Sequence, residues 1–409
     1  MELKWNPMRW PKGWNDPSAL ALLKGTCINY LLIEDGAGLD AVGEQARASG
    51  IQVGIASAAP GGVNIVQGEW PGLKMSPSGS KDVVSAGPTG APWVDSNGWK
   101  IRLESTLHPG LAIWVDAAPK DPNLSSDSYV IGVADSAAHG GRWIISLDEK
   151  LAAGIASQKP EALETWKKLT QASGFFAAHA DWVNYIPRGV VGVISDFSGD
   201  NEFLGQELLN LLARTNEQYR IIVKSQVSAS SFAGLRAVIY ADGNPPVADL
   251  QKQILVFVEG GGMLIAGPKW GPAPGAPLPH SNHRRYSSRT LGKGRVAIAT
   301  SDMDDPYVVA NDSVVLVSHR HDLLRFWNGG AFNSFFTTSP DRKRSIAQML
   351  FFVKSPDSAS VRVAGQYRSA RLWTLEASTP VPVTMQLEKG AVELHLPPIS
   401  RYAAVELEV

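Results

Sequence analysis

The sequence predicts a mixed α/β protein with a (β/α) barrel-like N-terminal unit, a flavodoxin-like middle unit and an all-β tail. Short apolar runs alternate with helical patterns up to residue 186, and the same alternation restarts at residue 187. The helical pattern is mostly lost after residue 305. Because a chain of 409 residues exceeds what one hydrophobic core usually serves, we expect separate units at 1–186, 187–305 and 306–409.

The N-terminal unit is predicted to be a reduced or irregular TIM-like (β/α) barrel. Its apolar runs have strand length and are separated by helical patterns, as is typical of buried parallel strands. A full barrel takes about 250 residues, so we expect a shortened one. The predicted strands are 27–34, 51–57, 63–70, 92–95, 111–117 and 142–148, with LKW near the N-terminus as a candidate seventh. The predicted helices are 39–50, 98–107, 128–139, 149–156 and 161–183.

The middle unit is predicted to be a doubly wound, flavodoxin-like α/β domain. Its central helix, NEFLGQELLNLLARTN at 201–216, is strongly amphipathic, and a second helix at 248–261 ends at a glycine cluster. The predicted strands are 189–197, 219–223, 235–243, 262–267 and 295–300. The segment 268–294 is rich in Pro, Gly and Ser, so we expect a long surface loop there.

The tail is predicted to be an antiparallel β-sandwich. Alternating apolar runs follow one another with turn residues between them, and EKG at 388–390 is typical of a hairpin turn. We expect VVLVSHRHDLLRFWN to contribute a strand. His319 and His321, beside Asp322, are then expected on a polar sheet face, and no metal site is predicted.

Composition excludes several classes of function. The net charge is -1 without a basic run, so no nucleic acid partner is expected. No apolar stretch approaches the roughly 20 residues that cross a bilayer, so no membrane partner is expected either. Cys27 is the single cysteine, which rules out an intramolecular disulfide, and no CxxC or HExxH motif suggests zinc. The opening MELKW carries no secretory leader, which leaves the compartment open, since a leader could have been removed.

Several motifs carry a resemblance to a known family. They are VVGVISDFSGDNEFLG and LGKGRVAIA in the middle unit, and DLLRFWN, YRSARLWTLE and LHLPPISRYAAVEL in the tail. With these motifs the chain resembles beta-galactosidases that carry a trimerisation domain, and it is similar to barrel proteins placed near the glycoside hydrolases. The resemblance implies a barrel, a class-I amidotransferase-like domain and a C-terminal β-sandwich, with glycosidic bonds hydrolysed in 1–186. The family's Asn-Glu pair at a strand end is not found, so its catalytic residues are not carried over.

The middle unit lacks the chemistry of an amidotransferase. That reaction needs a thiol on a sharp strand-to-helix turn, but the corresponding turn, YADGNPP, holds Asp242. Nucleotide or flavin binding is also disfavoured, because no GxGxxG follows the first strand and acidic side chains would repel a phosphate. We expect a structural or oligomerising role, as in a homodimer or homotrimer joined through this unit.

Four carboxylates of the N-terminal unit are candidates for catalysis. Glycosidic hydrolysis uses two carboxyl groups, one as an acid and one as a nucleophile or base, and barrel sites lie at the C-terminal strand ends. The candidates at such ends are, in order of preference, Asp95, Glu69, Asp148 and Asp116. Alternative interpretations are a turn or helix cap for Asp95, an N-cap for Asp148 and a loop start for Asp116.

Polar and aromatic side chains near these acids are candidates for binding a sugar. Ser96, Asn97 and Trp99 share one turn with Asp95, and Trp70 adjoins Glu69. Trp114 lies two residues before Asp116. Flat rings suit the apolar faces of sugars, although aromatic rings more often simply pack.

The leading hypothesis is therefore a glycoside hydrolase that acts on a saccharide and needs no cofactor. The alternative is a non-catalytic carbohydrate-binding or assembly protein that kept this architecture. A third option is an amidase-type hydrolase using the middle unit.

Overall fold

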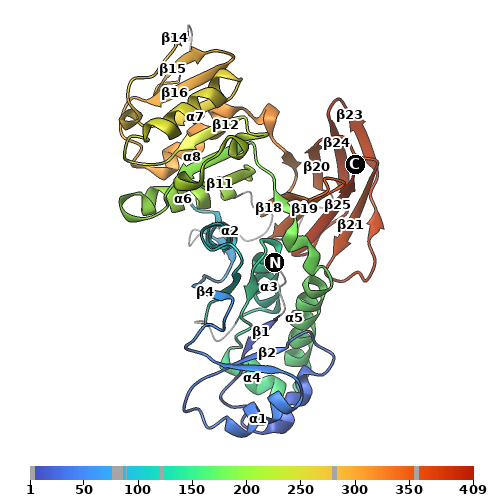
Figure 1. The fold of residues 1–409 in the computed structure, drawn as a ribbon. Helices are drawn as coiled ribbons and strands as arrows, with labels where there is room; N and C mark the ends of the chain where they lie inside the picture. Colours follow the sequence, from blue (N-terminus) through green and yellow to red (C-terminus); the bar gives the residue numbers. More distant parts are fainter. Residues whose placement is uncertain (1–4, 76–85, 89, 120–123, 279–282, 354–358) are drawn as a thin grey trace.

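The computed structural model describes residues 5–75, 86–88, 90–119, 124–278, 283–353 and 359–409. It is a mixed α/β chain with several sheets (Figure 1). In Figure 1 the N-terminal unit lies below, the middle unit lies above it, and the sheets of the tail stand beside both. The LKW run lies mostly outside the described residues, as do residues 279–282 of the predicted loop at 268–294.

The parallel strands of the N-terminal unit form two three-stranded sheets, joined by a parallel bridge between Met8 and Ile145. At this bridge the Ile145 carbonyl accepts from the Arg9 amide at 2.8 Å. The strands are β1 (Pro7–Arg9), β2 (Tyr30–Ile33), β3 (Gln52–Ile55), β4 (Val63–Gln67), β7 (Ala112–Asp116) and β8 (Arg142–Trp143). Across the bridge the strand order is β3-β2-β1-β8-β7-β4. β8 and β7 therefore lie between β1 and β4.

One predicted strand is not part of this parallel set. The segment at 92–95 forms β6 (Trp93–Asp95), which pairs antiparallel with β5 (Gly72–Lys74). The parallel strand that the sequence did not indicate is β1, whose three residues, PMR, are too short and too polar to form an apolar run.

The central parallel strands bury side chains on both faces, whereas β3 at the edge is largely exposed or half-buried. One face, which includes Leu31 and Val115, packs on the helices, and the other gathers Tyr30, Leu32 and Trp114 in a cluster of its own. The helices are α1 (Asp40–Ala48), α2 (Gly98–Leu107), α3 (Ser126–Ala138), α4 (Glu149–Ala156) and α5 (Pro160–Ala178), with 3-10 turns η1 (Pro17–Leu23) and η2 (Ala180–Asn184).

The middle unit holds a seven-stranded sheet of order β11-β10-β12-β13-β16-β15-β14. Its strands are β10 (Val191–Ser195), β11 (Tyr219–Val223), β12 (Ala237–Tyr240), β13 (Met263–Ala266), β14 (Ala276–Pro277), β15 (Tyr286–Leu291) and β16 (Gly294–Ala299), with helices α6 (Glu202–Arg214) and α7 (Ala248–Glu259). The five parallel strands follow the 2-1-3-4-5 order of flavodoxin-like sheets. The predicted loop at 268–294 is wrong in part, because β15 pairs antiparallel with β16 and β14 pairs antiparallel with β15, which extends the sheet.

A helix follows the middle unit where the sequence predicted strand. It is α8 (Pro306–Val317), and η7 (His319–His321) follows it, so the two histidines do not lie on a strand. The Asp305 carboxylate caps the first turn by accepting from the Tyr307 amide at 2.9 Å, and Pro306 suits the first helical position. Because α8 packs on α6, the boundary expected at 305 stays a prediction.

The tail consists of two antiparallel sheets that bury a shared apolar core between them. The first contains β17 (Leu324–Trp327), β20 (Ala359–Ala364), β24 (Ala391–Leu396) and β23 (Met385–Glu388). The second contains β22 (Val381–Pro382), β21 (Ser369–Thr374), β25 (Tyr402–Glu408), β19 (Arg344–Phe351), β18 (Phe332–Thr338) and β9 (Ile186–Pro187). β9 comes from the segment that links the first two units, so the sheet of the tail includes a segment from near the middle of the chain.

The second sheet of the tail also packs against the N-terminal unit, where α5 runs alongside it (Figure 1). The Tyr402 ring is fully buried and lies edge-on to Phe176, with ring centres 4.9 Å apart. Gln348 accepts from the Tyr402 hydroxyl at 2.7 Å and donates to the Ala138 carbonyl at 2.8 Å. This contact ties β19 and β25 to α3 and α5 through both apolar and polar groups.

Candidate functional site

Glu69 and Asp116 lie at the C-terminal ends of two neighbouring parallel strands. β4 and β7 pair with Gln67 opposite Asp116, and the Gly68 amide donates to the Asp116 carbonyl at 2.9 Å. Arg9, at the end of β1, donates from Nη2 to Oδ2 of Asp116 at 2.7 Å. The side chains of Arg9 and Asp116 are 22% and 24% exposed, and Glu69 is exposed. Two of the four predicted carboxylates therefore share one edge of the sheet.

The backbone of Glu69 is held by Asn97, which is 4% exposed. The Glu69 amide donates to Oδ1 of Asn97 at 2.9 Å, and Nδ2 of Asn97 donates to the Glu69 carbonyl at 2.8 Å. Asn97 also binds the fully buried Asp135, as does Ser96, whose hydroxyl donates at 2.5 Å. Ser96 and Asn97, predicted to bind a sugar, thus direct their polar groups into the protein.

Asp135 neighbours His139, one helical turn further along α3 and at its C-terminal end. Burial raises the pKa of Asp135, while His139 and the bonds from Ser96 and Asn97 lower it. Burial lowers the pKa of His139, which favours its neutral form. The ring nitrogen Nδ1 of His139 contacts the Asp135 carbonyl at 2.8 Å.

Asp95 is the residue that the sequence analysis ranked first for catalysis. In the structure its carboxylate connects the N-terminal unit to the middle unit. Its Oδ1 accepts from Nη2 of Arg214 on α6 at 2.9 Å and from Nε1 of Trp93 at 2.9 Å. Lys74 lies 3.6 Å from Oδ2. The carboxylate is thus bound by three neighbours, and its predicted catalytic role stays a prediction.

Asp148 serves as the N-cap of α4. Its Oδ1 accepts from the Leu151 amide at 2.8 Å, which is the alternative that the sequence left open. Its Oδ2 accepts from the hydroxyl of Tyr129 at 2.7 Å, and only 6% of the residue is exposed. Burial raises the pKa of Tyr129, so this hydroxyl keeps its proton and remains a donor.

The three tryptophans predicted to bind a sugar pack against protein groups. Trp114 is 1% exposed and lies edge-on to Tyr30 at 5.1 Å. Trp70 lies edge-on to Trp143 at 5.0 Å, and its Nε1 donates to the Ala118 carbonyl at 3.3 Å. Trp99 packs on the core of the middle unit. Trp70 and Trp99 remain partly exposed, whereas Trp114 is buried.

The turn of the middle unit that would carry an amidotransferase thiol holds an ion pair. Asp242 is 7% exposed and contacts Nζ of Lys224, which also lies 2.6 Å from Asp196. The thiol of Cys27 lies in the N-terminal unit, and burial raises its pKa, which disfavours a reactive thiolate. The residues at this turn therefore offer no thiol nucleophile.

A cavity of about 380 Å³ lies where the three units meet. The C-terminal ends of α2, α3 and α5 line it, together with residues of β11, β18 and β19. These helix ends point away from the predicted site. Its lining residues with basic side chains are Arg102, His139, Arg142, His179 and Arg220. Glu69, Asp95, Asp116 and Asp148 do not line this cavity, nor do they line three smaller cavities of the described residues. The arginines of this cavity were missed by sequence reasoning, since they share no motif or spacing.

A second cavity, of about 200 Å³, holds another group that the sequence did not indicate. Glu217 is 8% exposed, and burial together with the nearby charge of Asp322 raises its pKa to about 8. Asp322, whose pKa burial also raises, contacts Nδ1 of His319 at 3.0 Å. Among the described residues no group of three or more His, Cys, Asp or Glu could hold a metal ion.

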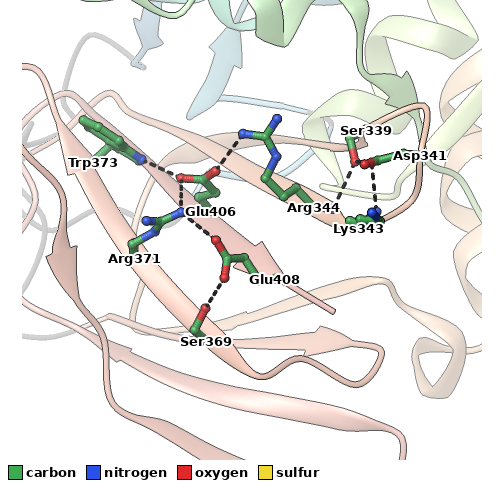
Figure 2. Close-up of polar contacts among 9 residues, drawn as sticks. All are labelled: Ser339, Asp341, Lys343, Arg344, Ser369, Arg371, Trp373, Glu406 and Glu408. Carbon is green, nitrogen blue, oxygen red and sulfur yellow. Dashed lines mark hydrogen bonds and ion pairs between the residues drawn. The ribbon is translucent and has the colours of Figure 1, made fainter.

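The tail carries a polar network around Glu406 (Figure 2). Glu406 is 5% exposed and lies 3.4 Å from Nη1 of Arg344 and 3.3 Å from Nη2 of Arg371. Nε1 of Trp373 donates to it at 3.2 Å, while Arg371 also binds Glu408. The charge of Glu406 is thus neutralised within its own sheet.

No helix within the described residues is long and apolar enough to cross a membrane. Comparisons with protein-family models and with curated proteins give no match.

Comparison with solved structures gives several glycoside hydrolases. An alpha-L-fucosidase isoenzyme 2 from Paenibacillus thiaminolyticus aligns over 90% of this chain and 70% of its own, at 11% identity and a TM-score of 0.50. A rhamnosidase from Novosphingobium sp. PP1Y aligns over 91% of this chain and 38% of its own, at 12% identity and a TM-score of 0.50. A GH42 beta-galactosidase from G. stearothermophilus aligns over 80% of this chain and 63% of its own, at 10% identity and a TM-score of 0.42.

The chain thus spans less than two thirds of the rhamnosidase and of the galactosidase. At this level of identity the likeness concerns the fold alone. It shows that this chain has a glycoside-hydrolase-like fold.

Proposed function

We propose that this protein is a glycoside hydrolase whose reacting carboxylates are Glu69 and Asp116, in a shortened (β/α) barrel. One observation carries the proposal: the two acids stand at the C-terminal ends of the adjacent parallel strands β4 and β7. In barrel enzymes the reacting groups lie at this end of the strands. The fold likeness to a fucosidase and a rhamnosidase supports the same class of reaction.

The two acids have different surroundings, which suggests different roles. Asp116 is oriented by Arg9 at 2.7 Å, so we assign it the attack on the anomeric carbon or the activation of water. Glu69 is exposed and its backbone is fixed by Asn97, so we assign it protonation of the leaving oxygen. Trp70, next to Glu69, is the ring we expect to contact the sugar.

Asp95 and Asp148 rank below this pair as catalytic groups. Arg214 and Trp93 bind the first carboxylate, and the cap of α4 and Tyr129 bind the second. These bonds occupy both oxygens of Asp148 and give Oδ1 of Asp95 two donors, whereas the Asp116 carboxylate accepts one hydrogen bond among the described residues, from Arg9.

The test is hydrolysis of aryl glycosides, with L-fucosides, L-rhamnosides and D-galactosides in the panel. Glu69→Gln and Asp116→Asn should each abolish turnover, with the thermal midpoint of Glu69→Gln unchanged. Glu34→Gln is the matched control, since Glu34 follows β2 and is paired with Lys12 at 2.7 Å. Full activity in both variants would refute the assignment of Glu69 and Asp116 as the reacting carboxylates. Loss of activity only in Asp95→Asn or Asp148→Asn would instead favour that carboxylate, which the sequence analysis also proposed.

A non-catalytic carbohydrate-binding or assembly protein is the second candidate. It is favoured by the observation that none of the four carboxylates lines a described cavity. A wild-type protein that cleaves no glycoside of the panel but binds oligosaccharides in calorimetry would establish this alternative. Association into a dimer or trimer through the middle unit, tested by light scattering, belongs to the same prediction.

A further inference from the structure

The cavity of about 380 Å³ at the meeting point of the three units, here called the junction cavity, has a strongly cationic wall. Three arginines line it, Arg102 from α2, Arg142 from β8 and Arg220 from β11. Of the residues described as lining it, none is aspartate or glutamate. None of these three arginines forms an ion pair with a carboxylate of the described chain.

Arg142 is the least compensated of the three. It is 6% exposed, and its one hydrogen bond among the described residues goes from Nη1 to the Gly141 carbonyl at 3.1 Å. Nε and Nη2 are buried without a partner. Burial lowers its pKa to about 10, so the group still carries its charge at neutral pH. A buried charge without a partner costs free energy, which an anion in the cavity would recover.

The other two arginines are anchored by neutral groups, which leaves their charge in place. Arg102 donates from Nη2 to the Tyr219 carbonyl at 2.6 Å and lies over the rings of Tyr219 and Phe335. Arg220 donates to the Ser231 and Ala233 carbonyls at 2.9 Å, and its Nε has no partner. These contacts fix the direction of each guanidinium without supplying a negative charge.

The buried carboxylates near the wall are already bound by other groups. Glu406 contacts Trp373, whose ring lies 4.5 Å from that of the lining residue His179, but Arg344 and Arg371 neutralise it (Figure 2). Asp135 precedes His139 on α3 and is held by Ser96 and Asn97. Neither Glu406 nor Asp135 therefore neutralises the positive charge of the three lining arginines.

The rest of the wall suits an apolar group with a few acceptors or donors. Two buried hydroxyls without a partner, Oη of Tyr185 and Oγ1 of Thr337, belong to lining residues. The larger apolar side chains that line it are Phe176, Trp182, Val183, Ile186, Ile221 and Phe335. A volume of about 380 Å³ falls in the range of small-molecule sites, which lies at roughly 300–1,000 Å³.

From this arrangement we propose that the junction cavity binds a small organic anion, with a carboxylate or phosphate head on Arg142 and an apolar body among the aromatic side chains. The planar guanidinium group of arginine can form two parallel hydrogen bonds with a carboxylate or with a phosphate. The proposal does not rest on the glycosidase assignment, because the cavity contains none of the proposed catalytic residues. Since all three units line it, its ligand would also hold them together.

The test is calorimetric titration of the full chain with benzoate, phenyl phosphate and the neutral benzyl alcohol. Both anions present an oxyanion on a ring, and the better binder identifies the head group. We expect saturable binding of at least one anion and none of the alcohol. Arg142→Gln should weaken the anion affinity by about tenfold to a hundredfold, as expected for a lost charge-assisted hydrogen bond.

Arg47→Gln on α1 is the matched control, because Arg47 is exposed and remote from the cavity. Arg220→Gln provides a second variant if Arg142→Gln does not fold, and it should weaken binding in the same direction. Equal affinity for the alcohol, no saturable anion binding at millimolar concentration, or unchanged affinity in the folded Arg142 or Arg220 variant would each overturn the proposal. Glu69→Gln should leave anion binding intact, which separates this site from the proposed catalytic one.

Discussion

Asp95 and Arg214 form an ion pair of 2.9 Å that connects β6 of the N-terminal unit to α6 of the middle unit. The Arg214 side chain is 10% exposed, and its guanidinium lies over the Trp93 ring, 5.7 Å from the centre. The turn around Asp95 attracted attention in the sequence as a mixture of polar and aromatic groups. In the structure Asp95 and Trp99 of this turn contact the middle unit, while Ser96 and Asn97 bind groups of the N-terminal unit.

Asp95→Asn should lower the free energy of unfolding by about 1–3 kcal/mol, because it leaves Arg214 largely buried without its charged acceptor. Urea unfolding of Asp95→Asn, Arg214→Met and the double variant would give the coupling energy. The double variant should lose less than the sum of the two single ones. Lys74→Gln is the control, since Lys74 is 47% exposed and lies 3.6 Å away. Strict additivity would show that the pair does not stabilise the contact.

Glu217→Gln should make the stability less dependent on pH. The pKa of Glu217 is raised to about 8 from 4.5, so the native state keeps a proton that the unfolded chain releases above pH 4.5. The wild type therefore loses stability as the pH rises from 4.5 to about 8, and the neutral glutamine does not. We expect the variant to match the wild type near pH 4.5 and to exceed it by about 1–3 kcal/mol near pH 8.

Urea unfolding at several pH values would measure this difference. Glu44→Gln on the exposed face of α1 is the control and should follow the wild type throughout. A Glu217→Gln curve that runs parallel to the wild type from acid to alkaline pH would show that Glu217 is ionised in the folded protein.

The elements that the sequence predicted well are those with a strong local pattern. The helices α2 and α4 were expected at 98–107 and 149–156 and lie there, because their ends carry turn or capping residues. α8 was missed, since VVANDSVVLV is apolar on most faces and lacks helical periodicity. The signal that would have found it is Asp305 followed by Pro306, a cap and a first-turn residue.

The candidate site could be predicted only in part, because sequence position does not reveal which carboxylates meet a partner. Glu69 and Asp116 lie near each other because β4 pairs with β7. The sequence of neither strand indicates which strand it pairs with. Asp148 could be recognised as a cap from its place before EKLAAGI. Arg102, Arg142 and Arg220 lie in three elements far apart in the chain, and only tertiary packing brings them to one cavity.

Asp148→Ala should destabilise the protein by about 2–4 kcal/mol, since it removes the cap of α4 and the acceptor of the buried Tyr129 hydroxyl. Asp148→Asn should cost less, because asparagine also caps helices. Tyr129→Phe removes the hydroxyl while the cap remains, so it should cost less than Asp148→Ala. Thermal and urea unfolding of the three variants would measure this order, and equal losses for alanine and asparagine would argue against the capping role.

Asn97→Ala should loosen the segment that carries Glu69 as well as destabilise the fold. The substitution removes the acceptor of the Glu69 amide and a donor to the Glu69 carbonyl, which are 2.9 and 2.8 Å away. It also takes one hydrogen bond from the buried Asp135, so we expect a loss of about 2–4 kcal/mol. Hydrogen exchange by mass spectrometry should show faster exchange at Glu69 in this variant. Ser96→Ala, which removes a bond to Asp135 but none to Glu69, is the control that should leave this exchange slow. Unchanged exchange at Glu69 in Asn97→Ala would mean that strand pairing alone positions the proposed acid.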